Sequence, residues 1–252
     1  MNPDEYTHMY EEEENHWWYV GMRLIVRSML RPSSFAPHFR ALDAGCGTGY
    51  SMGWLRLNYG CSVAGIDSYA EGLAFSRRRG ERNLAQADVA ALPFRSGVFD
   101  LVTSFDVLSH VRDESSCARA LGEFFRVLKR GGVLLVRVAA YDWLRSSHDD
   151  EILTYHRFGR RELREAVSSA GFHISRATFA NTFLFPGAVL WRCLKKLGVA
   201  PAGSDVRSST RGPGWMNRTL LEFLALEAKL LNRARFGFPF GLSLFIEAVR
   251  KD

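Results

Sequence analysis

Short apolar segments alternate with longer amphipathic ones along most of the chain. The short segments are candidate strands, and the first five are Ala41–Ala44, Ser62–Asp67, Leu84–Asp88, Phe99–Ser104 and Gly132–Ala139. The segments between them have helical character, namely Tyr50–Tyr59, Tyr69–Arg79 and Glu114–Lys129. Strands that alternate with helices in this way indicate βαβ units and a parallel sheet.

The pattern changes towards both ends of the chain. Residues 1–38 are predicted to be helical, polar at first and then aromatic. Arg160–Ala170 is predicted to be a helix closed by Gly171, and Lys129–Gly132 to end another helix at its glycines. Two last strands are predicted at Phe172–Phe179 and Leu242–Val249. The insertion between them holds a Gly/Ser/Pro-rich loop, Gly198–Pro213, and an amphipathic helix near Met216–Ala234.

These elements predict a single α/β domain, which suits a chain of 252 residues. The expected fold is a Rossmann-like, seven-stranded, doubly wound sheet with an N-terminal helical lid and a helical insertion before the last strand. We divide the chain into the lid (1–38), a core (39–180), a helical cap insertion (181–238) and the last strand (239–252).

The strongest chemical signal is the turn Gly45-Cys46-Gly47-Thr48-Gly49, which follows the first strand directly. Glycines allow a tight turn and a close approach of a ligand to the backbone, and the next helix begins with free N–H groups. The spacing differs from the G-x-G-x-x-G of dinucleotide sites. Asp43 would repel a pyrophosphate but suits a ligand with a cationic amino group.

Two more carboxylates end the next two strands. Asp67 lies 18 residues after Gly49, where a carboxylate can accept hydrogen bonds from both hydroxyls of a ribose. Asp88 can accept from an adenine amino group, and the Val89 N–H can donate to the adenine ring.

These blocks, together with Phe99–Phe105 and Val127–Gly132, resemble the class I S-adenosylmethionine-dependent methyltransferases, in particular the small-molecule branch called methyltransferase type 11. The resemblance covers about residues 39–180. It implies an enzyme with S-adenosylmethionine as cofactor, and it implies that Asp43 and the glycines hold the methionine part, Asp67 the ribose, and Asp88 with Val89 the adenine. Ser104 and Phe105 would line the methionine side. The expected cofactor set is completed by Ala44, Cys46 and Ser68.

Two residues are candidates for catalysis. His110 follows the fourth strand, where the chain should pass the sulfonium, and could be a base for an acceptor that carries a proton. The alternative is a histidine that packs or caps this loop. Tyr19 lies in the aromatic run His16-Trp17-Trp18-Tyr19, which either packs the first helices onto the sheet or forms a lid over the cofactor.

Acceptor binding is expected from residues outside the cofactor blocks. The candidates are His16 and Trp18 in the lid, and Tyr155, His156 and Arg157 after the fifth strand. The nearby His148-Asp149-Asp150 has no metal-ligand spacing, so no metal is expected. The insertion, with Phe183, Phe185, Trp191 and Trp215, either caps an apolar or amphiphilic acceptor or completes the core.

Charge and cysteine content limit the partners. The formal net charge is +6, and residues 185–252 carry eleven Lys/Arg against five Asp/Glu. This excess is either solvated surface or a basic rim that attracts an anionic substrate or, weakly, a membrane surface. No basic stripe interleaved with aromatics suggests nucleic-acid binding, and no apolar stretch is long enough to span a membrane. The four cysteines form no C-x-x-C pair, which fits a cytoplasmic protein. We expect this protein to be a monomer or a homodimer.

The expected function is methyl transfer to a small-molecule acceptor, in natural-product, glycan or lipid biosynthesis, with O-, N- and C-methylation all open. A short-chain dehydrogenase would need Tyr-x-x-x-Lys, and none of the eight tyrosines has a lysine four residues later. The remaining alternative is a methyltransferase fold repurposed as a cyclase or as a non-catalytic binding subunit.

Overall fold

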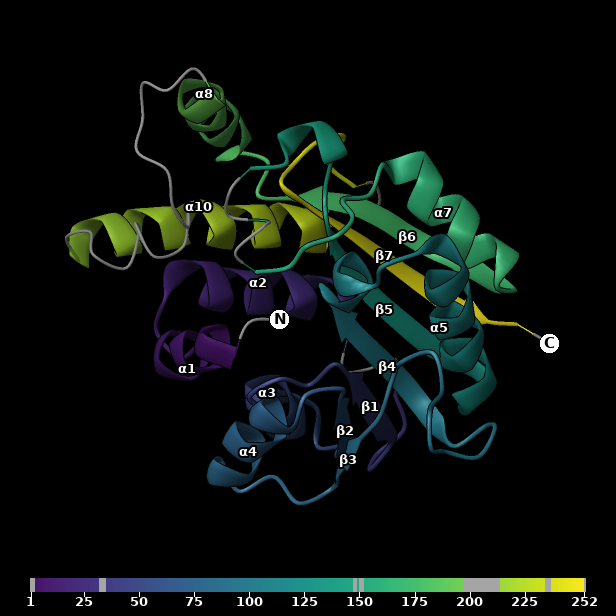
Figure 1. Ribbon diagram of the computed structural model, residues 1–252. Coiled ribbons are helices and arrows are strands. Elements are labelled where there is room, and N and C mark those ends of the chain that lie inside the picture. Colours follow the sequence, from purple (N-terminus) through teal and green to yellow (C-terminus); the bar gives the residue numbers. More distant parts are fainter. Residues whose placement is uncertain are drawn as a thin grey trace.

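Seven strands form one sheet in the order β3-β2-β1-β4-β5-β7-β6 (Figure 1). The structure is a computed structural model that describes residues 3–31, 35–146, 149, 152–196, 214–233 and 237–251. The strands are β1 (Arg40–Ala44), β2 (Ser62–Asp67), β3 (Leu84–Gln86), β4 (Phe99–Phe105), β5 (Leu128–Ala139), β6 (Phe172–Ala180) and β7 (Ser243–Arg250).

The first five strands are parallel, and β7 lies antiparallel between β5 and β6. The predicted Rossmann-like, seven-stranded fold is therefore confirmed. From β1 the chain moves outward to β2 and β3, and then returns to β4 on the other side of β1. In such sheets ligands bind at this point of reversal, outside the carboxyl ends of the strands.

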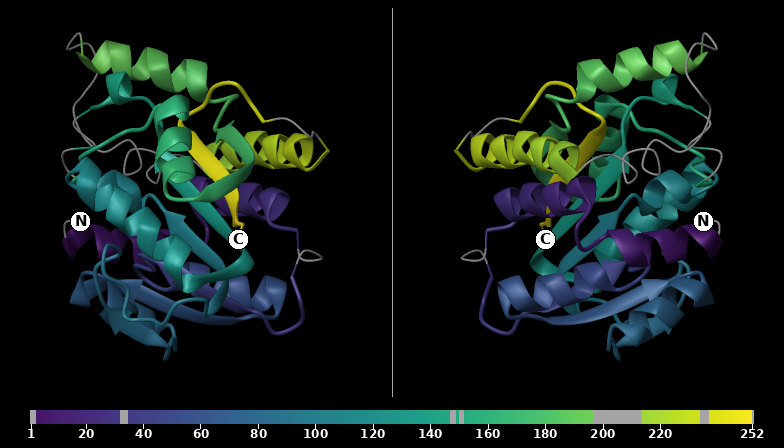
Figure 2. Two further views of the ribbon diagram at one scale, coloured as in Figure 1. Left: turned by 90° about the vertical axis from the view of Figure 1, so that its right-hand side faces the viewer. Right: turned by 90° about the vertical axis from the view of Figure 1, so that its left-hand side faces the viewer.

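Helices cover both faces of the sheet (Figures 1 and 2). They are α1 (Pro3–Glu12), α2 (Trp17–Met29), α3 (Tyr50–Tyr59), α4 (Ala70–Arg78), α5 (Glu114–Val127), α7 (Arg160–Ser169), α8 (Phe185–Lys196) and α10 (Gly214–Arg233). Two short 3-10 helices, η2 (Val107–His110) and η3 (Asp142–Leu144), follow β4 and β5. Within the described ranges, no helix is both long and apolar enough to cross a membrane.

Alternate strand residues face two separate hydrophobic cores. Leu134 and Val136 of β5 join the core that contains Phe124 of α5. Leu135, between them, joins the core that contains Ile25 of α2 and Leu224 of α10. All six side chains are buried, so the sheet is apolar on both faces.

The lid and the insertion, far apart in the sequence, pack against each other. Helices α2 and α10 lie side by side, and a Cβ atom on Gly21 would come within 2.1 Å of the Leu224 side chain. The backbone N–H of Trp17 donates to Asn217 Oδ1 at 2.8 Å. Glycine at position 21 is thus required for the close approach of the two helices.

Most predicted elements agree with the structure within two residues, but the junction of α5 with β5 was wrong, because β5 was predicted to begin at Gly132 and begins at Leu128. The helix ends at Val127, and the buried Leu128 already pairs with Phe99 as the first residue of β5. The register then jumps to Leu101 opposite Val133, so residues 129–132 form a bulge in which Gly131 has φ +75°. Strand β3 stops at Gln86 rather than Asp88. The loop predicted at Gly198–Pro213 lies outside the described residues.

Candidate active site

A large cavity of about 1130 Å³ lies at the carboxyl ends of the parallel strands. One part, the β1–β3 half, is lined by residues at the ends of β1, β2 and β3, including Asp43, Asp67 and Asp88. The other part, the β5–β7 half, is lined by Arg137 of β5, Asn181 after β6 and Ser243 of β7. Residues of α1, α2, α3, α8 and α10 and of the segments that follow β4 and β5 also line the cavity.

The glycine-rich turn forms the floor of the β1–β3 half. Gly45, Gly47 and Gly49 have φ of +87°, +52° and +80°, a region that favours glycine. A Cβ atom on Gly45 would lie 2.1 Å from the Val107 side chain, so no larger residue fits there. The N–H groups of Gly45 and Cys46 both donate to the carbonyl oxygen of Ile66 at 2.8 Å, which fixes the turn to β2.

Asp43 is buried beneath this turn. The Thr103 hydroxyl donates to its Oδ1 at 2.9 Å. Burial raises the pKa of Asp43 to about 7, and the Thr103 hydrogen bond partly opposes this. A cationic ligand group above the turn would stabilise the ionised form.

Asp67 is also buried, and three donors meet on its carboxylate. The N–H groups of Gly47 and Tyr69 donate to it at 2.9 Å each, and the Tyr6 hydroxyl donates at 3.1 Å. Asp88 is exposed and accepts from the Ala90 N–H at 2.8 Å.

The structure brings most of the predicted cofactor residues to the cavity. The residues that line it are Asp43, Gly45, Cys46, Gly47, Asp67, Ser68, Asp88, Val89 and Phe105. Three others are not part of the lining, namely Ala44, Gly49 and Ser104. Ala44 is fully buried in the sheet, and Gly49 lies so close to Ser76 that a Cβ atom would be 2.7 Å from its hydroxyl oxygen.

The lid contributes contacts that the sequence analysis missed. Tyr6 of α1 is buried and reaches Asp67 across 61 positions of sequence. Glu13, just after α1, accepts from the Thr48 hydroxyl and from Arg79. No local pattern marks these pairs, since each joins the lid to a distant part of the core.

Arg137 and Asp106, which both line the cavity, form an ion pair that the sequence analysis missed. Arg137 donates to Asp106 Oδ2 at 2.6 and 3.0 Å, and its guanidinium carbon lies 4.8 Å from the centre of the Trp18 ring and 5.1 Å from that of Phe105. Asp106 has φ +63°. Asp106 directly follows β4, and Arg137 of β5 lies opposite Phe105, so the pairing of these two strands brings the two side chains together.

The two candidate catalytic residues, His110 and Tyr19, both line the cavity. The Nδ1 atom of His110 lies 2.9 Å from the carbonyl oxygen of Leu153. A carbonyl oxygen only accepts, so Nδ1 carries the proton and Nε2 keeps a lone pair. Burial lowers the pKa of His110 and raises that of Tyr19, so both side chains are neutral near pH 7.

The candidate acceptor residues separate into two groups. Trp18, Tyr155 and Arg157 line the cavity, and Arg157 is buried in an ion pair with Asp149 at 2.8 Å. His16 and His156 are not part of the lining. His16 caps α2 by accepting from the Trp18 N–H, and burial lowers its pKa to about 4.

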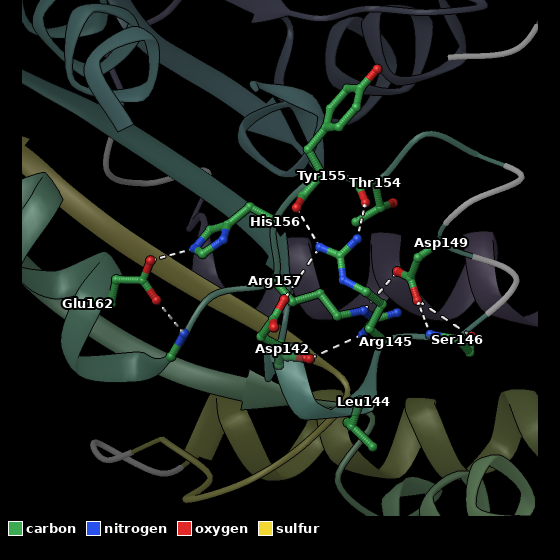
Figure 3. Close-up of polar contacts among 12 residues, drawn as sticks. Asp142, Leu144, Arg145, Ser146, Asp149, Thr154, Tyr155, His156, Arg157 and Glu162 are labelled. Carbon is green, nitrogen blue, oxygen red and sulfur yellow. Dashed lines mark hydrogen bonds and ion pairs between the residues drawn. The ribbon is translucent and has the colours of Figure 1, made fainter. Parts of the chain in front are cut away.

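His156 does not line the cavity, although Tyr155 and Arg157 on either side of it do. Its ring points towards Glu162 at the start of α7 and pairs with it, whereas Arg157 points to Asp149 (Figure 3). Arg145 donates to the carbonyl oxygens of Thr154 and Tyr155 and holds this segment together. His148 and Asp150 lie outside the described residues.

Comparisons with known proteins agree with this architecture. The model of a methyltransferase domain family matches residues 42–136. A protein of Mycolicibacterium smegmatis named "probable S-adenosylmethionine-dependent methyltransferase" is 31% identical over 221 residues, which cover 85% of this chain and 80% of that protein. The chain therefore belongs to the S-adenosylmethionine-dependent methyltransferases.

Of two further similarities, one covers a smaller part of the chain and the other has a lower sequence identity. The tRNA (carboxymethyluridine(34)-5-O)-methyltransferase of Arabidopsis thaliana is 34% identical over 113 residues, which cover 45% of this chain but 26% of that protein. A solved complex between the Haloferax volcanii Trm112 methyltransferase activator and a methyltransferase matches with a TM-score of 0.62 and 21% identity, over 99% of this chain and 95% of that chain. At this identity the structural match supports the fold alone.

S-adenosylmethionine is thus the cofactor, as predicted, and the residues of the β1–β3 half fit it. A Cβ atom on Gly47 would be in van der Waals contact with side-chain atoms of Met9 and Tyr6, at 3.5 and 3.8 Å, so α1 of the lid covers the turn at this point. Buried carboxylates beneath and beside the turn suit a cationic amino group and ribose hydroxyls. The roles of the individual residues remain predictions.

Proposed function

We propose that the protein methylates a small molecule bound in the β5–β7 half of the cavity. The observation that carries this proposal is that the cavity continues from the predicted cofactor residues into a second half, lined by Trp18, Trp191 and Leu184 among others. Its volume of about 1130 Å³ exceeds the range of about 300–1,000 Å³ typical of a pocket for one ligand. An acceptor therefore has room beside the cofactor.

In this proposal Asp43 holds the amino group of the cofactor, Asp67 the ribose hydroxyls and Asp88 the adenine. When bound, S-adenosylmethionine supplies a methyl group that its sulfonium makes electrophilic. The protein then has to orient the acceptor for an in-line attack, and positioning of this kind supplies much of the rate.

An acceptor hydroxyl or amine must also lose a proton as it attacks, and we propose His110 as the base. The Nδ1–H of His110 is directed at the Leu153 carbonyl oxygen, which leaves Nε2 to take the proton. The Tyr19 phenol, kept protonated by burial, would donate a hydrogen bond to the acceptor rather than remove its proton.

Transfer of an isotope-labelled methyl group tests the proposal. The protein and labelled S-adenosylmethionine are incubated with the small-molecule fraction of a cell extract or with total RNA, the substrate class of one relative. We expect label in small molecules, and mass spectrometry and NMR of the product then identify the methylated O, N or C atom. Label in RNA, or in neither fraction although the cofactor binds, would overturn the proposal.

A further inference from the structure

The turn after β6 places a buried amide group at the wall of the cavity. Asn181 lines the β5–β7 half and is only 1% exposed. Its Oδ1 is buried and has no hydrogen-bond partner in the part of the chain that the structure describes. Its backbone has φ +60°, the left-handed region. An unpaired buried polar group and a left-handed residue both cost stability, so a ligand role is the natural explanation.

A second buried polar group holds this turn in place. Glu227 of α10 is fully buried, and its Oε1 accepts from the Phe183 N–H at 2.7 Å. Burial raises the pKa of Glu227, and backbone N–H groups of the turn oppose this. The Thr182 hydroxyl donates to the Phe240 carbonyl oxygen at 2.7 Å. The fold thus uses a costly buried carboxyl group to fix the position of Asn181.

The surroundings indicate which chemistry the amide would recognise. The guanidinium groups of Arg137 and Arg157 are each paired with a carboxylate, at 2.6 and 2.8 Å. Arg192 donates to the Leu144 carbonyl oxygen at 2.7 Å. Neither ion-paired arginine offers an uncompensated charge to an anion, whereas the Asn181 amide is neutral and can both donate and accept.

The walls of this half add an apolar requirement. Trp18 and Trp191 line it, and Ser243, which pairs with Ala180 next to Asn181, adds a hydroxyl group. A ligand with an apolar or ring-shaped face and neutral hydroxyl groups matches both kinds of wall.

We propose that Asn181 binds the methyl acceptor through a hydrogen bond to a hydroxyl group, and that the acceptor is a neutral, hydroxyl-bearing molecule. This inference rests on the proposed function, because it assumes that the β5–β7 half holds the acceptor. Asn181 is then a specificity-determining residue, and Glu227 is a positioning residue that acts through the turn.

The first test separates a binding role from a structural one. Glycine tolerates φ +60°, so Asn181→Gly removes the amide without backbone strain. The matched control is His38→Gly, because His38 has φ +57°, is exposed and does not line the cavity. Without ligand, we expect Asn181→Gly to melt no lower than His38→Gly. A melting temperature lower by more than about 2–4 °C, equivalent to about 1 kcal/mol, would show a structural role and overturn the inference.

The second test uses three probes that share a benzene ring, with S-adenosylhomocysteine saturating throughout. They are phenyl β-D-glucoside, phenyl phosphate and toluene. We expect phenyl β-D-glucoside to raise the melting temperature of the wild type and of His38→Gly, and to bind Asn181→Gly at least about tenfold more weakly. Equal binding by Asn181→Gly, no shift with the glucoside, or a larger shift with phenyl phosphate would each overturn the inference.

Failure of the proposed function can be distinguished from failure of the Asn181 inference. If the glucoside binds through Asn181 but no small molecule is ever methylated, the function fails and the subsite stands. If a small acceptor is methylated with the same kcat/KM by Asn181→Gly and by the wild type, the function stands and the subsite fails. Calorimetry with S-adenosylhomocysteine should give the same Kd for the wild type, Asn181→Gly and His38→Gly. An equal Kd shows that neither result is caused by a loss of cofactor binding.

Discussion

At the scale of single residues, the proposed role of His110 as the base can be tested directly by substitution. General-base help is typically worth about 10²–10⁴-fold, so His110→Ala should lower turnover by about that factor with a small-molecule acceptor, while the affinity for S-adenosylhomocysteine hardly changes. Burial lowers the pKa of His110, and a base works above its pKa. The wild-type rate should therefore fall only below about pH 6.5, the ordinary value for histidine, and the variant should lack this acid limb.

The control for this prediction is His173→Ala, since His173 is exposed on β6 and does not line the cavity. Normal turnover in the His110 variant would assign the ring a structural role at the Leu153 carbonyl. A parallel loss of cofactor affinity would mean that the ring supports the loop instead.

Asp67→Ala should weaken cofactor binding more than Asp88→Ala. In the proposed mode the buried Asp67 holds two ribose hydroxyls by charge-assisted bonds, each worth about 1.5–3 kcal/mol, whereas the exposed Asp88 holds one amino group. Calorimetry with S-adenosylhomocysteine measures both variants against the wild type. Unchanged affinity in the Asp67 variant would show that the ribose lies elsewhere.

Asp43 should make cofactor binding depend on pH. Its pKa of about 7 is raised by burial, so in the free protein it becomes protonated as the pH falls below 7. The cationic amino group of the cofactor prefers the ionised form, and binding should weaken by at most about tenfold for each unit below pH 7. Titrations of S-adenosylhomocysteine between pH 5.5 and 8 check this. Asp43→Asn should bind weakly at every pH, and a wild type without pH dependence would contradict the assignment.

At the scale of elements, α1 is the part of the lid that touches the predicted ribose site. The Tyr6 hydroxyl and the Tyr69 N–H both occupy Oδ1 of Asp67, where the ribose would also bind. A hydrogen bond contributes about 0.5–1.5 kcal/mol net, so Tyr6→Phe should raise the affinity for S-adenosylhomocysteine by up to about tenfold. Tyr10→Phe, on the same helix against Phe75, is the control. Weaker binding in Tyr6→Phe would mean that the hydroxyl supports the bound state.

The elements themselves were largely predictable, because periodicity and glycine stops are local signals. Strand β2 and helix α3 were predicted with their observed bounds. The start of β5 was not, since the pairing of Leu128 with Phe99 across the sheet outweighs the glycine stop after Lys129. Helix α8 was not separated from the rest of the insertion. Its place depends on contacts of the Asn181 turn with α10, which no local pattern encodes.

The same division between local and distant signals holds at the scale of the whole molecule. The carboxylates of the β1–β3 half each follow a recognisable strand, so the cofactor could be predicted from the sequence through a known family pattern. The β5–β7 half is assembled from α2, β5, the turn after β6, α8 and the start of β7. Pairs such as Asp106 with Arg137 or Glu227 with the Asn181 turn join segments 31 to 44 residues apart. The family model matches residues 42–136, so α2, the turn after β6, α8 and the start of β7 lie outside it, and the acceptor could not be read from the sequence.

Cofactor binding should stabilise the whole domain, because the cavity joins the lid, the sheet and the insertion. With micromolar affinity, equivalent to about −8 kcal/mol, about 0.1 mM S-adenosylhomocysteine is about 100 times Kd and adds about 2.7 kcal/mol to the free energy of unfolding. For a chain of this size, 1 kcal/mol raises Tm by about 2–4 °C, so we expect a rise of about 5–11 °C.

NAD at the same concentration should leave Tm unchanged. Its pyrophosphate would have to lie over the glycine turn, beside the Asp67 carboxylate and above Asp43, which repels it in the ionised form and prefers a cationic ligand. The Asp67→Ala protein is the internal control, since its melting temperature should respond much less to S-adenosylhomocysteine than that of the wild type. Because ligand-induced stabilisation reports binding anywhere in the fold, the measurement does not presuppose the site. A rise with NAD and none with S-adenosylhomocysteine would contradict both the residue roles and the physical reasoning that separates this turn from a pyrophosphate site.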